Sequence, residues 1–226
     1  LAQKVGATVV DAKEIQLNPT LLVGSPVIVS ETVRGAGAVF VNREGKRFIS
    51  ELTTRDVTSA AVSKQTGGTA FEIFDDKVRQ GVKQTGAAFE LGLAKEGKTL
   101  AELAKNAGID PKNLEATIAQ YNKYAEAGKD PDFNRPGLSA KLKVDKAPFY
   151  AIEITPAIHY YMGGLKFNGK TQVINTSGKP IGGLYAAGEV TGGVHGKNRL
   201  GGNSISETIT FGRLAGENAA AQVLGK

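Results

Sequence analysis

The stretch Gly182–Gly212 combines a loop almost free of side chains with polar groups suited to ligand recognition. Nine glycines lie in it, and six of them fall between a strand expected at 184–187 and a helix expected from residue 204. Such a backbone can approach a ligand closely. Asn203 and Ser204 are types that cap a helix, whose free N–H groups and positive dipole end attract anionic ligands. The polar residues among the glycines are Glu189, His195, Arg199 and Asn203. We therefore expect a ligand site here.

A second set of charged residues, Glu31, Arg34 and Arg55, has the composition of an Arg–Glu–Arg cluster. Taken alone, such a set is more often structural than catalytic. Arginine is an unusual acid because its pKa is above about 12. It can donate a proton only where the site is desolvated and a neighbouring group reprotonates it at once. Both interpretations stay open on the residues themselves.

The elements that must position these residues follow from apolar periodicity and turn signals. Strands are expected at Val27–Val29, Ala38–Val41, Phe71–Phe74, Phe149–Ile154, Gly164–Phe167 and Val173–Asn175. Helices are expected at Asp56–Gln65, Thr99–Ala107, from Pro111 to Gly128, and Ser204–Leu224. Asp110 should cap the third helix, and Gly45 should form a turn within NREGKR. The apolar stripe of the third helix, which indicates core packing, consists of Leu114, Ile118, Tyr121 and Ala125.

Composition limits the classes of function. The chain has 226 residues, 41% hydrophobic and 22% charged, which is typical of a globular protein. Its net charge is +6, but no basic run of five occurs, so we predict electrostatic steering of anionic substrates rather than nucleic-acid binding. The absence of cysteine excludes disulfides and thiolate chemistry, and two histidines without acidic companions argue against a metal site. No apolar run reaches the roughly 20 residues of a membrane span.

The motif GLYAAGEVTGGVHGKNRLGGNSISE resembles the C-terminal flavin-binding segment of the fumarate reductase and succinate dehydrogenase flavoproteins. It is most similar to the soluble single-chain fumarate reductases, which include the flavin domain of flavocytochrome c. The resemblance implies non-covalent FAD. It assigns the ribityl chain to Glu189 and the pyrimidine edge of the flavin to the backbone after GGN, at Asn203, Ser204 and Ile205.

The resemblance also implies the fold, which is α/β plus α+β. Residues 1–16 would be the tail of the first part of an FAD-binding domain. Residues 17–154 would form an inserted mixed α+β capping domain, and residues 155–226 the C-terminal half of the Rossmann-like FAD-binding domain. The GxGxxG turn that receives the FAD pyrophosphate is absent from this sequence. We therefore expect a fragment whose N-terminal FAD-binding segment lies elsewhere.

Further motifs, SETVRG, NREGKRF and TTRD, extend the resemblance. Arg55 corresponds to the arginine that serves as proton donor, and Glu31 and Arg34 to the relay behind it. Protons would pass from Arg34 to Glu31 to Arg55. His159 and Arg199 correspond to the residues that hold one substrate carboxylate, in which the arginine supplies a two-pronged fork.

The second carboxylate site departs from the family pattern. Asn18 stands where a histidine is usual, and Ser30 where a threonine is usual. Tyr160 and Tyr161 also replace a smaller polar pair. Since asparagine carries no charge, a dicarboxylate would be compensated less well at this end. A monocarboxylic enoate of the acrylate, cinnamate or urocanate type is therefore the alternative substrate to fumarate.

The expected function is FAD-dependent reduction of the C=C bond of fumarate or a related 2-enoate, in the context of anaerobic respiration. Two alternatives remain: oxidation on the same fold, as in succinate dehydrogenase, aspartate oxidase or ketosteroid dehydrogenase, and a non-catalytic fragment without FAD. The electron donor, a haem or NADH-linked flavin module, would lie outside this chain. The resemblance suggests the periplasm, with the cytoplasm as alternative.

Overall fold

The computed structural model describes residues 1–225 and divides the chain into two compact units. The first unit comprises residues 1–17 and the chain from Ile158 onward, and the second comprises Asn18–Ala157. Both boundaries fall inside strands, β2 (Ile15–Leu22) and β6 (Phe149–Tyr161). The sequence-based limits after residues 16 and 154 lie beside these boundaries.

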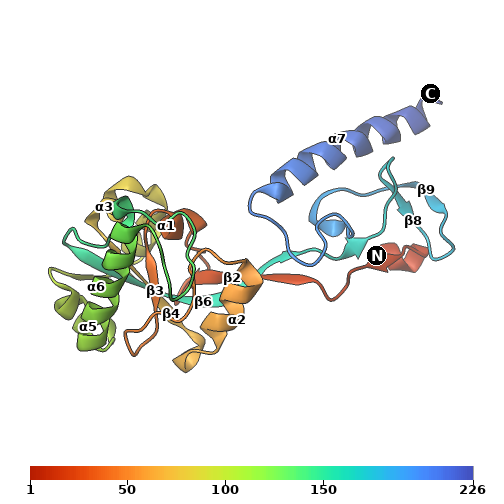
Figure 1. Cartoon of the computed structure of the whole chain (residues 1–226). Helices are drawn as coiled ribbons and strands as arrows, with labels where there is room; N and C mark the ends of the chain where they lie inside the picture. The colour runs from red at the N-terminus through yellow and green to blue at the C-terminus, as the bar shows by residue number, and fades with distance from the viewer. Residues whose placement is uncertain (226) are drawn as a thin grey trace. The chain divides into compact units, whose positions relative to one another are not determined.

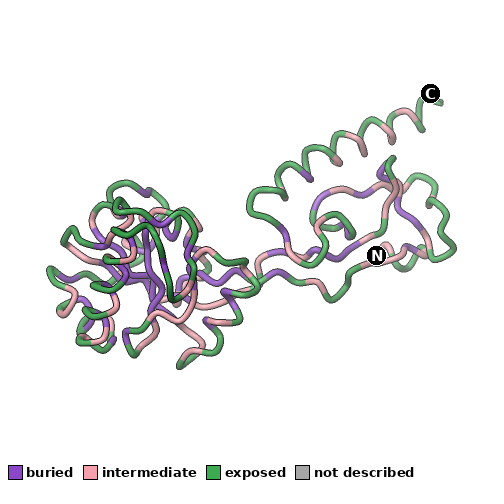
Figure 2. Tube along the Cα trace, in the orientation of Figure 1, coloured by how far each residue is buried: buried purple, intermediate pink, exposed green. Residues whose placement is uncertain are grey.

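A five-stranded sheet forms the centre of the second unit, in the order β2-β6-β4-β3, with β5 (Lys95–Gly97) also paired to β6. β4 (Ala70–Asp75) runs antiparallel to β3 (Val39–Val41) and to β6. All six residues of β4 are buried, so side chains on both of its faces lie inside the unit. Figure 2 shows this as a purple centre.

One face of the sheet is covered by α5 (Leu100–Ala107) and α6 (Pro111–Ala127), as Figure 1 shows. Asp110 caps α6 by accepting a hydrogen bond from the Asn113 amide at 2.8 Å, as expected. The predicted stripe of Leu114, Ile118, Tyr121 and Ala125 is buried, which confirms core packing. The turn at Gly45 is also confirmed: its φ is 72°, and a Cβ there would approach the Leu114 amide nitrogen to 2.7 Å.

The other face is covered by shorter helices. These are α1 (Glu31–Gly35), α2 (Arg55–Ser63), α3 (Asp76–Gly81) and α4 (Gly86–Glu90). Val33 of α1 and Val62 of α2 pack with Phe40, Phe74 and Ile152 of the strands in one apolar cluster. Three 3₁₀ turns, η2 (Thr66–Gly68), η3 (Lys83–Thr85) and η4 (Ala140–Leu142), complete the unit.

The first unit is smaller and has little regular sheet. It contains η1 (Ala2–Val5), β1 (Val9–Val10), β7 (Gly164–Leu165), β8 (Gln172–Ile174), β9 (Pro180–Tyr185), η5 (Gly188–Val190) and α7 (Asn203–Val223). β1 pairs antiparallel with β7, and β8 with β9. None of the helices within residues 1–225 has the length and apolar character that crossing a membrane requires.

Two expectations were wrong. The segment 27–29 is no strand: only Ile28 forms an isolated bridge, to Leu21, where the chain turns back on β2 after Pro26, which has no N–H to donate. The expected side-chain cap of α7 is also missing. Its N-cap is Gly202, whose φ of 84° suits a residue without a side chain. The expected strand at 184–187 ends earlier, at Tyr185.

Candidate active site

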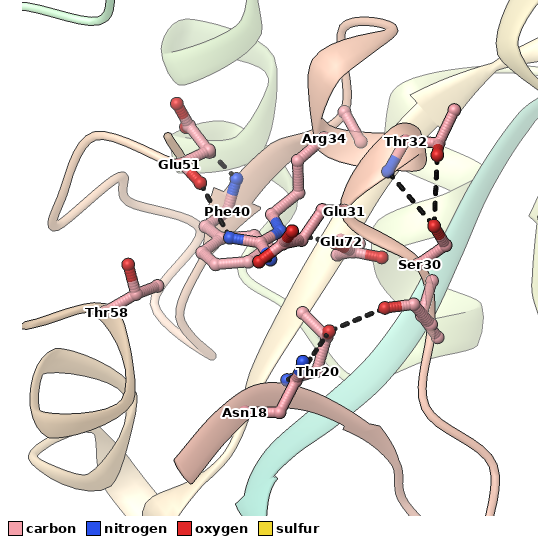
Figure 3. A network of polar contacts seen from close by, with 12 residues as sticks. Asn18, Thr20, Ser30, Glu31, Thr32, Arg34, Phe40, Glu51, Thr58 and Glu72 are labelled. Atoms are coloured by element: carbon pink, nitrogen blue, oxygen red, sulfur yellow. Dashed lines mark hydrogen bonds and ion pairs between the residues drawn. The ribbon is translucent and has the colours of Figure 1, made fainter. Parts of the chain in front are cut away.

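Helix α1 of the second unit presents Glu31 and Arg34 one turn apart, on the same side of the helix. Ser30 starts this helix, since its Oγ accepts a hydrogen bond from the Thr32 amide at 3.2 Å. Figure 3 shows Arg34 and Glu31 close together, with Ser30 at the beginning of the helix. The cap therefore fixes the backbone that carries two of the predicted relay residues.

The structure brings all three predicted relay residues into contact. Glu31 Oε1 lies 2.7 Å from Arg55 Nε, at the start of α2, and 3.5 Å from Arg34 Nη2. One carboxylate oxygen therefore bridges two guanidinium groups. Such an arrangement favours the ionised carboxylate and holds both arginines in a fixed relation.

The three relay residues differ in how far their side chains are exposed. The side chain of Arg34 is 2% exposed, that of Arg55 is 12% exposed and that of Glu31 is 43% exposed. Burial lowers the pKa of Arg34, while the negative charges of Glu72 and Glu31 oppose this effect. Arg34 is therefore the inner member, although the expected order of transfer places it first.

A buried ion-pair network, which the sequence analysis missed, holds the end of α1. Arg135 donates to Glu51 Oε2 at 2.7 Å and to the carbonyl oxygen of Arg34 at 2.6 Å. Glu51 also accepts from Arg47 at 2.9 Å, and its own carbonyl accepts from Arg34 Nη1 at 2.9 Å. Arg47 and Glu51 are four residues apart, but the contacts of Arg135 with Glu51 and Arg34 span 84 and 101 residues, which no local pattern could reveal.

Asn18 and Ser30, the two substitutions in the expected second carboxylate site, have different surroundings. Asn18 is 2% exposed, and its Oδ1 accepts from the Thr20 amide at 3.0 Å and from the Thr20 hydroxyl at 2.8 Å. These bonds leave the amide nitrogen Nδ2 as the donor end of the side chain. Ser30 has its hydroxyl engaged with Thr32.

In the first unit, a cavity of about 410 Å³ collects most of the other predicted residues. Its lining consists of His159, Tyr160, Glu189, Arg199, Ser204, Ile205, Thr208 and Ile209. Both proposed carboxylate ligands and three of the four proposed cofactor residues are in this set; Asn203 is exposed beside it. Residues from β6, the glycine-rich loop and α7 thus meet at one place.

Arg199 is held in this cavity by aromatic and backbone contacts. It is 5% exposed, and its guanidinium carbon lies 4.4 Å from the centre of the Tyr160 ring, a cation–π arrangement. Gln16 donates to the carbonyl oxygen of Arg199 and to Asn198 Oδ1, each at 2.6 Å. The ring of His195 also packs edge to face with the Tyr160 ring, with centroids 5.5 Å apart. Burial lowers the pKa of His195, and Arg199 adds to this while Glu207 opposes it.

Glu189 and Glu207 fix the turn that follows β9. Glu189 accepts a hydrogen bond from the Tyr161 amide at 2.9 Å. Glu207, only 5% exposed, accepts from the Gly188 amide at 3.0 Å and from the Thr191 hydroxyl at 3.4 Å. Glu207 was missed in the sequence, where it reads as an ordinary helix residue. Its burial ties α7 to the loop that carries Glu189.

The backbone amides at the N-terminus of α7 differ in their partners. The Ile205 amide donates to the Gly202 carbonyl at 3.0 Å, and the Asn203 amide to the Leu200 carbonyl at 3.2 Å. Among residues 1–225, no backbone oxygen accepts from the Ser204 amide. Since Ser204 and Ile205 line the cavity, this helix end suits a ligand that carries hydrogen-bond acceptors.

Comparison with known proteins shows the family of this chain. Residues 1–205 match the family described as FAD binding domain. The chain is 51% identical to the fumarate reductase (cytochrome) of Shewanella frigidimarina over 220 residues, which cover 97% of this chain and 38% of that protein. It is 42% identical to the NADH:acrylate oxidoreductase of Vibrio harveyi, over 97% of this chain and 22% of that protein.

A solved structure shows the same fold. The open conformation of a flavocytochrome c3 fumarate reductase matches with a TM-score of 0.78 and 46% identity, over 99% of this chain and 39% of that chain. This confirms the expected mixed α/β fold. The chain spans less than two fifths of the length of these two fumarate reductases, 38% and 39%. With a family match that extends from residue 1 to residue 205, this chain belongs to the FAD binding domain family.

Proposed function

We propose that the protein containing this chain reduces the C=C bond of fumarate, or of a closely related 2-enoate, with FAD as its cofactor. The observation that carries the proposal is the Glu31 carboxylate that bridges Arg34 and Arg55. An arginine can act as an acid only with such a partner. The similarity to a fumarate reductase and an acrylate oxidoreductase supports the same class of reaction.

The lining of the cavity in the first unit supports a flavin site. Its uncapped helix end offers the Ser204 amide, and a flavin ring carries carbonyl acceptors. Glu189, Asn203, Ser204 and Ile205 would hold FAD without a covalent bond. When bound, FAD supplies hydride chemistry; a hydride is one of the two components that a C=C reduction needs.

The other component is a proton, which we assign to Arg55. Loss of a proton from Arg55 leaves a neutral guanidine beside Glu31 Oε1. A proton passed along the Glu31–Arg34 contact restores the charge. The positive charge of Arg55 also stabilises negative charge that develops on the substrate.

His159 and Arg199 would bind one substrate carboxylate. The Tyr160 ring packs against the face of the Arg199 guanidinium, and Nη1 of Arg199 donates to the Leu200 carbonyl at 3.1 Å, so the arginine is held in place at the cavity. Asn18 and Ser30, which we propose as the further substrate-binding residues, are neutral hydrogen-bond donors. This observation favours a monocarboxylic enoate as the second candidate substrate.

Reduction also needs a source of electrons. The names of the relatives include a cytochrome and an NADH-linked enzyme. We propose a haem or NADH-linked flavin module, together with an N-terminal FAD-binding segment, as partners of this chain.

The test uses the complete protein, purified with its flavin and reduced anaerobically. Reoxidation of the flavin is followed in the visible spectrum after addition of fumarate, acrylate or urocanate. We expect rapid reoxidation by at least one enoate, and slow reoxidation in Arg55→Ala. A flavin-loaded wild-type protein that none of these enoates reoxidises would refute the proposed reaction. A complete protein without flavin bands would support the non-catalytic alternative.

A further inference from the structure

We propose that Glu72 is the fourth member of the Arg34–Glu31–Arg55 relay, a positioning residue that stores the proton with which Arg34 restores the relay after each turnover. This inference rests on the proposed function. It concerns a residue that neither the sequence motifs nor the expected relay includes.

The position of Glu72 is unusual for a glutamate. It lies in the middle of β4, where it pairs with Phe40 of β3 and Ile152 of β6. Its neighbours on the same face of the strand, Ala70 and Phe74, belong to the apolar cluster below α1 and α2. Glu72 is 0% exposed. A carboxyl in this place costs free energy unless it is neutral or well paired.

Its pairing is incomplete. The nearest cation is Arg34, whose Nε lies 3.9 Å from Glu72 Oε1. Among residues 1–225, neither oxygen of Glu72 has a hydrogen-bond partner, and neither do Nε and Nη2 of Arg34. Figure 3 shows the two side chains facing each other behind Glu31. A structural ion pair buried this deeply would be expected to have its hydrogen bonds satisfied.

The charges that act on Arg34 and, through it, on the Arg34–Glu72 pair come from three segments. Arg34 and Glu31 lie on α1, Arg55 at the start of α2, and Glu51 in the segment before it. Strands β3 and β6 contribute the apolar Phe40 and Ile152. Burial raises the pKa of Glu72 to about 7; Arg34 lowers it and Glu51 raises it. Both protonation states are therefore populated near neutral pH.

The proton balance closes with one proton taken up from the solvent in each turnover. After Arg55 gives its proton to the substrate, Arg34 gives a proton to the Glu31 carboxylate, and Glu31 passes a proton on to Arg55. The protonated Glu72 then gives its proton to Arg34, and a carboxylate is left beside a guanidinium. One proton has moved along four groups. The carboxyl of Glu72 takes up a proton from water before the next turnover.

The main test compares Glu72→Gln with wild type in the complete, flavin-loaded protein. Glutamine keeps the size of the side chain but cannot hold or release the proton. We expect kcat of wild type to show an ionisation near neutral pH that disappears in the variant, with KM almost unchanged. Glu153→Gln is the control, because Glu153 lies on the adjacent strand β6 and pairs with Arg43, away from the relay. It should keep the wild-type pH profile.

A conservative variant separates a proton store from a structural role. Glu72→Asp keeps a titratable carboxyl, so we expect it to retain the ionisation in the kcat profile. If Glu72→Asp loses the ionisation together with Glu72→Gln, or if both keep it, the inference is wrong. The comparison is made at equal flavin content, which shows that each variant has folded.

A readout independent of turnover decides the case in which Glu72→Gln does not fold. Infrared spectra of the wild-type protein, with ¹³C-labelled glutamate, report protonated carboxyl groups directly. We expect one buried carboxyl to titrate near neutral pH; Glu72→Asp removes its labelled signal. A set of glutamates that are all ionised from about pH 5 to about pH 9 would overturn the inference. Failure of the wild type to reduce any enoate would refute the proposed function and leave this titration standing.

Discussion

Replacement of Glu72 by glutamine should change how the stability of the second unit depends on pH. The pKa of Glu72 rises from 4.5 to about 7 because the side chain is buried. A carboxyl with a raised native pKa contributes fully to stability below its unfolded pKa, and the contribution is lost as pH rises through the native pKa. With about 1.4 kcal/mol for each pKa unit, wild type should lose about 3 kcal/mol between about pH 4.5 and pH 7 through this group.

Glutamine removes that loss, because it does not ionise. Asp130 and Asp145 have lowered pKa values and act in the opposite direction, but they are present in both proteins. The difference in stability between variant and wild type therefore isolates Glu72. It should shift in favour of Glu72→Gln by up to about 3 kcal/mol from about pH 4.5 to about pH 8.

Hydrogen exchange measures this difference locally in the complete protein. The free energy of opening is obtained for peptides that cover β4, after correction for the chemical exchange rate at each pH. Peptides from α7 in the first unit serve as an internal control and should show no difference. If the difference in opening free energy between variant and wild type stays constant across this pH range, the pKa of Glu72 is not raised by burial and the reasoning is wrong.

Four further predictions concern the site and the core. Arg55→Ala should lower kcat by about 10²–10⁴-fold, while Arg55→Lys keeps part of the activity; steady-state kinetics with an unchanged kcat and a raised KM would make Arg55 a binding residue instead. Glu189→Ala should weaken FAD retention, measured by flavin fluorescence after ultrafiltration, and equal retention would exclude its role. Asn18→His should raise kcat/KM for fumarate relative to acrylate, and a constant ratio would contradict the argument from charge. Leu114→Ala should destabilise the second unit by about 2–5 kcal/mol in urea denaturation, because it opens a cavity under α6.

The sequence was most informative where local signals agreed with each other. Asp110 and Pro111 mark the start of α6, and the apolar spacing that follows places Leu114 and Ile118 in the core. The start of α7 shows the opposite case. Asn203 is a frequent capping residue, but Gly202 accepts a left-handed conformation and takes the N-cap position without any side chain.

The candidate site could be predicted only in part, because some of its contacts join residues that no local sequence pattern connects. The motifs named Glu31, Arg34 and Arg55, and the fold brings their charged ends together; their roles stay predictions. The sequence pattern did not indicate a role for Glu72, because FEIF is typical of an apolar strand in which a single glutamate points to solvent. β4 is buried on both faces, so its alternation places that glutamate inside. Burial on both faces is a property of the complete fold, not of the segment.

The cap of α1 limits which side chains position 30 can carry. Ser30 starts the helix that carries Glu31 and Arg34, and loss of such a cap costs about 1 kcal/mol. Position 30 can therefore exchange serine for threonine, aspartate or asparagine, but an apolar residue there would loosen the helix itself. Asn18 is also constrained, because it is buried and its Oδ1 accepts two hydrogen bonds from Thr20. Position 30 thus tolerates only a few small polar residues, and position 18 favours a side chain that can accept the hydrogen bonds of Thr20.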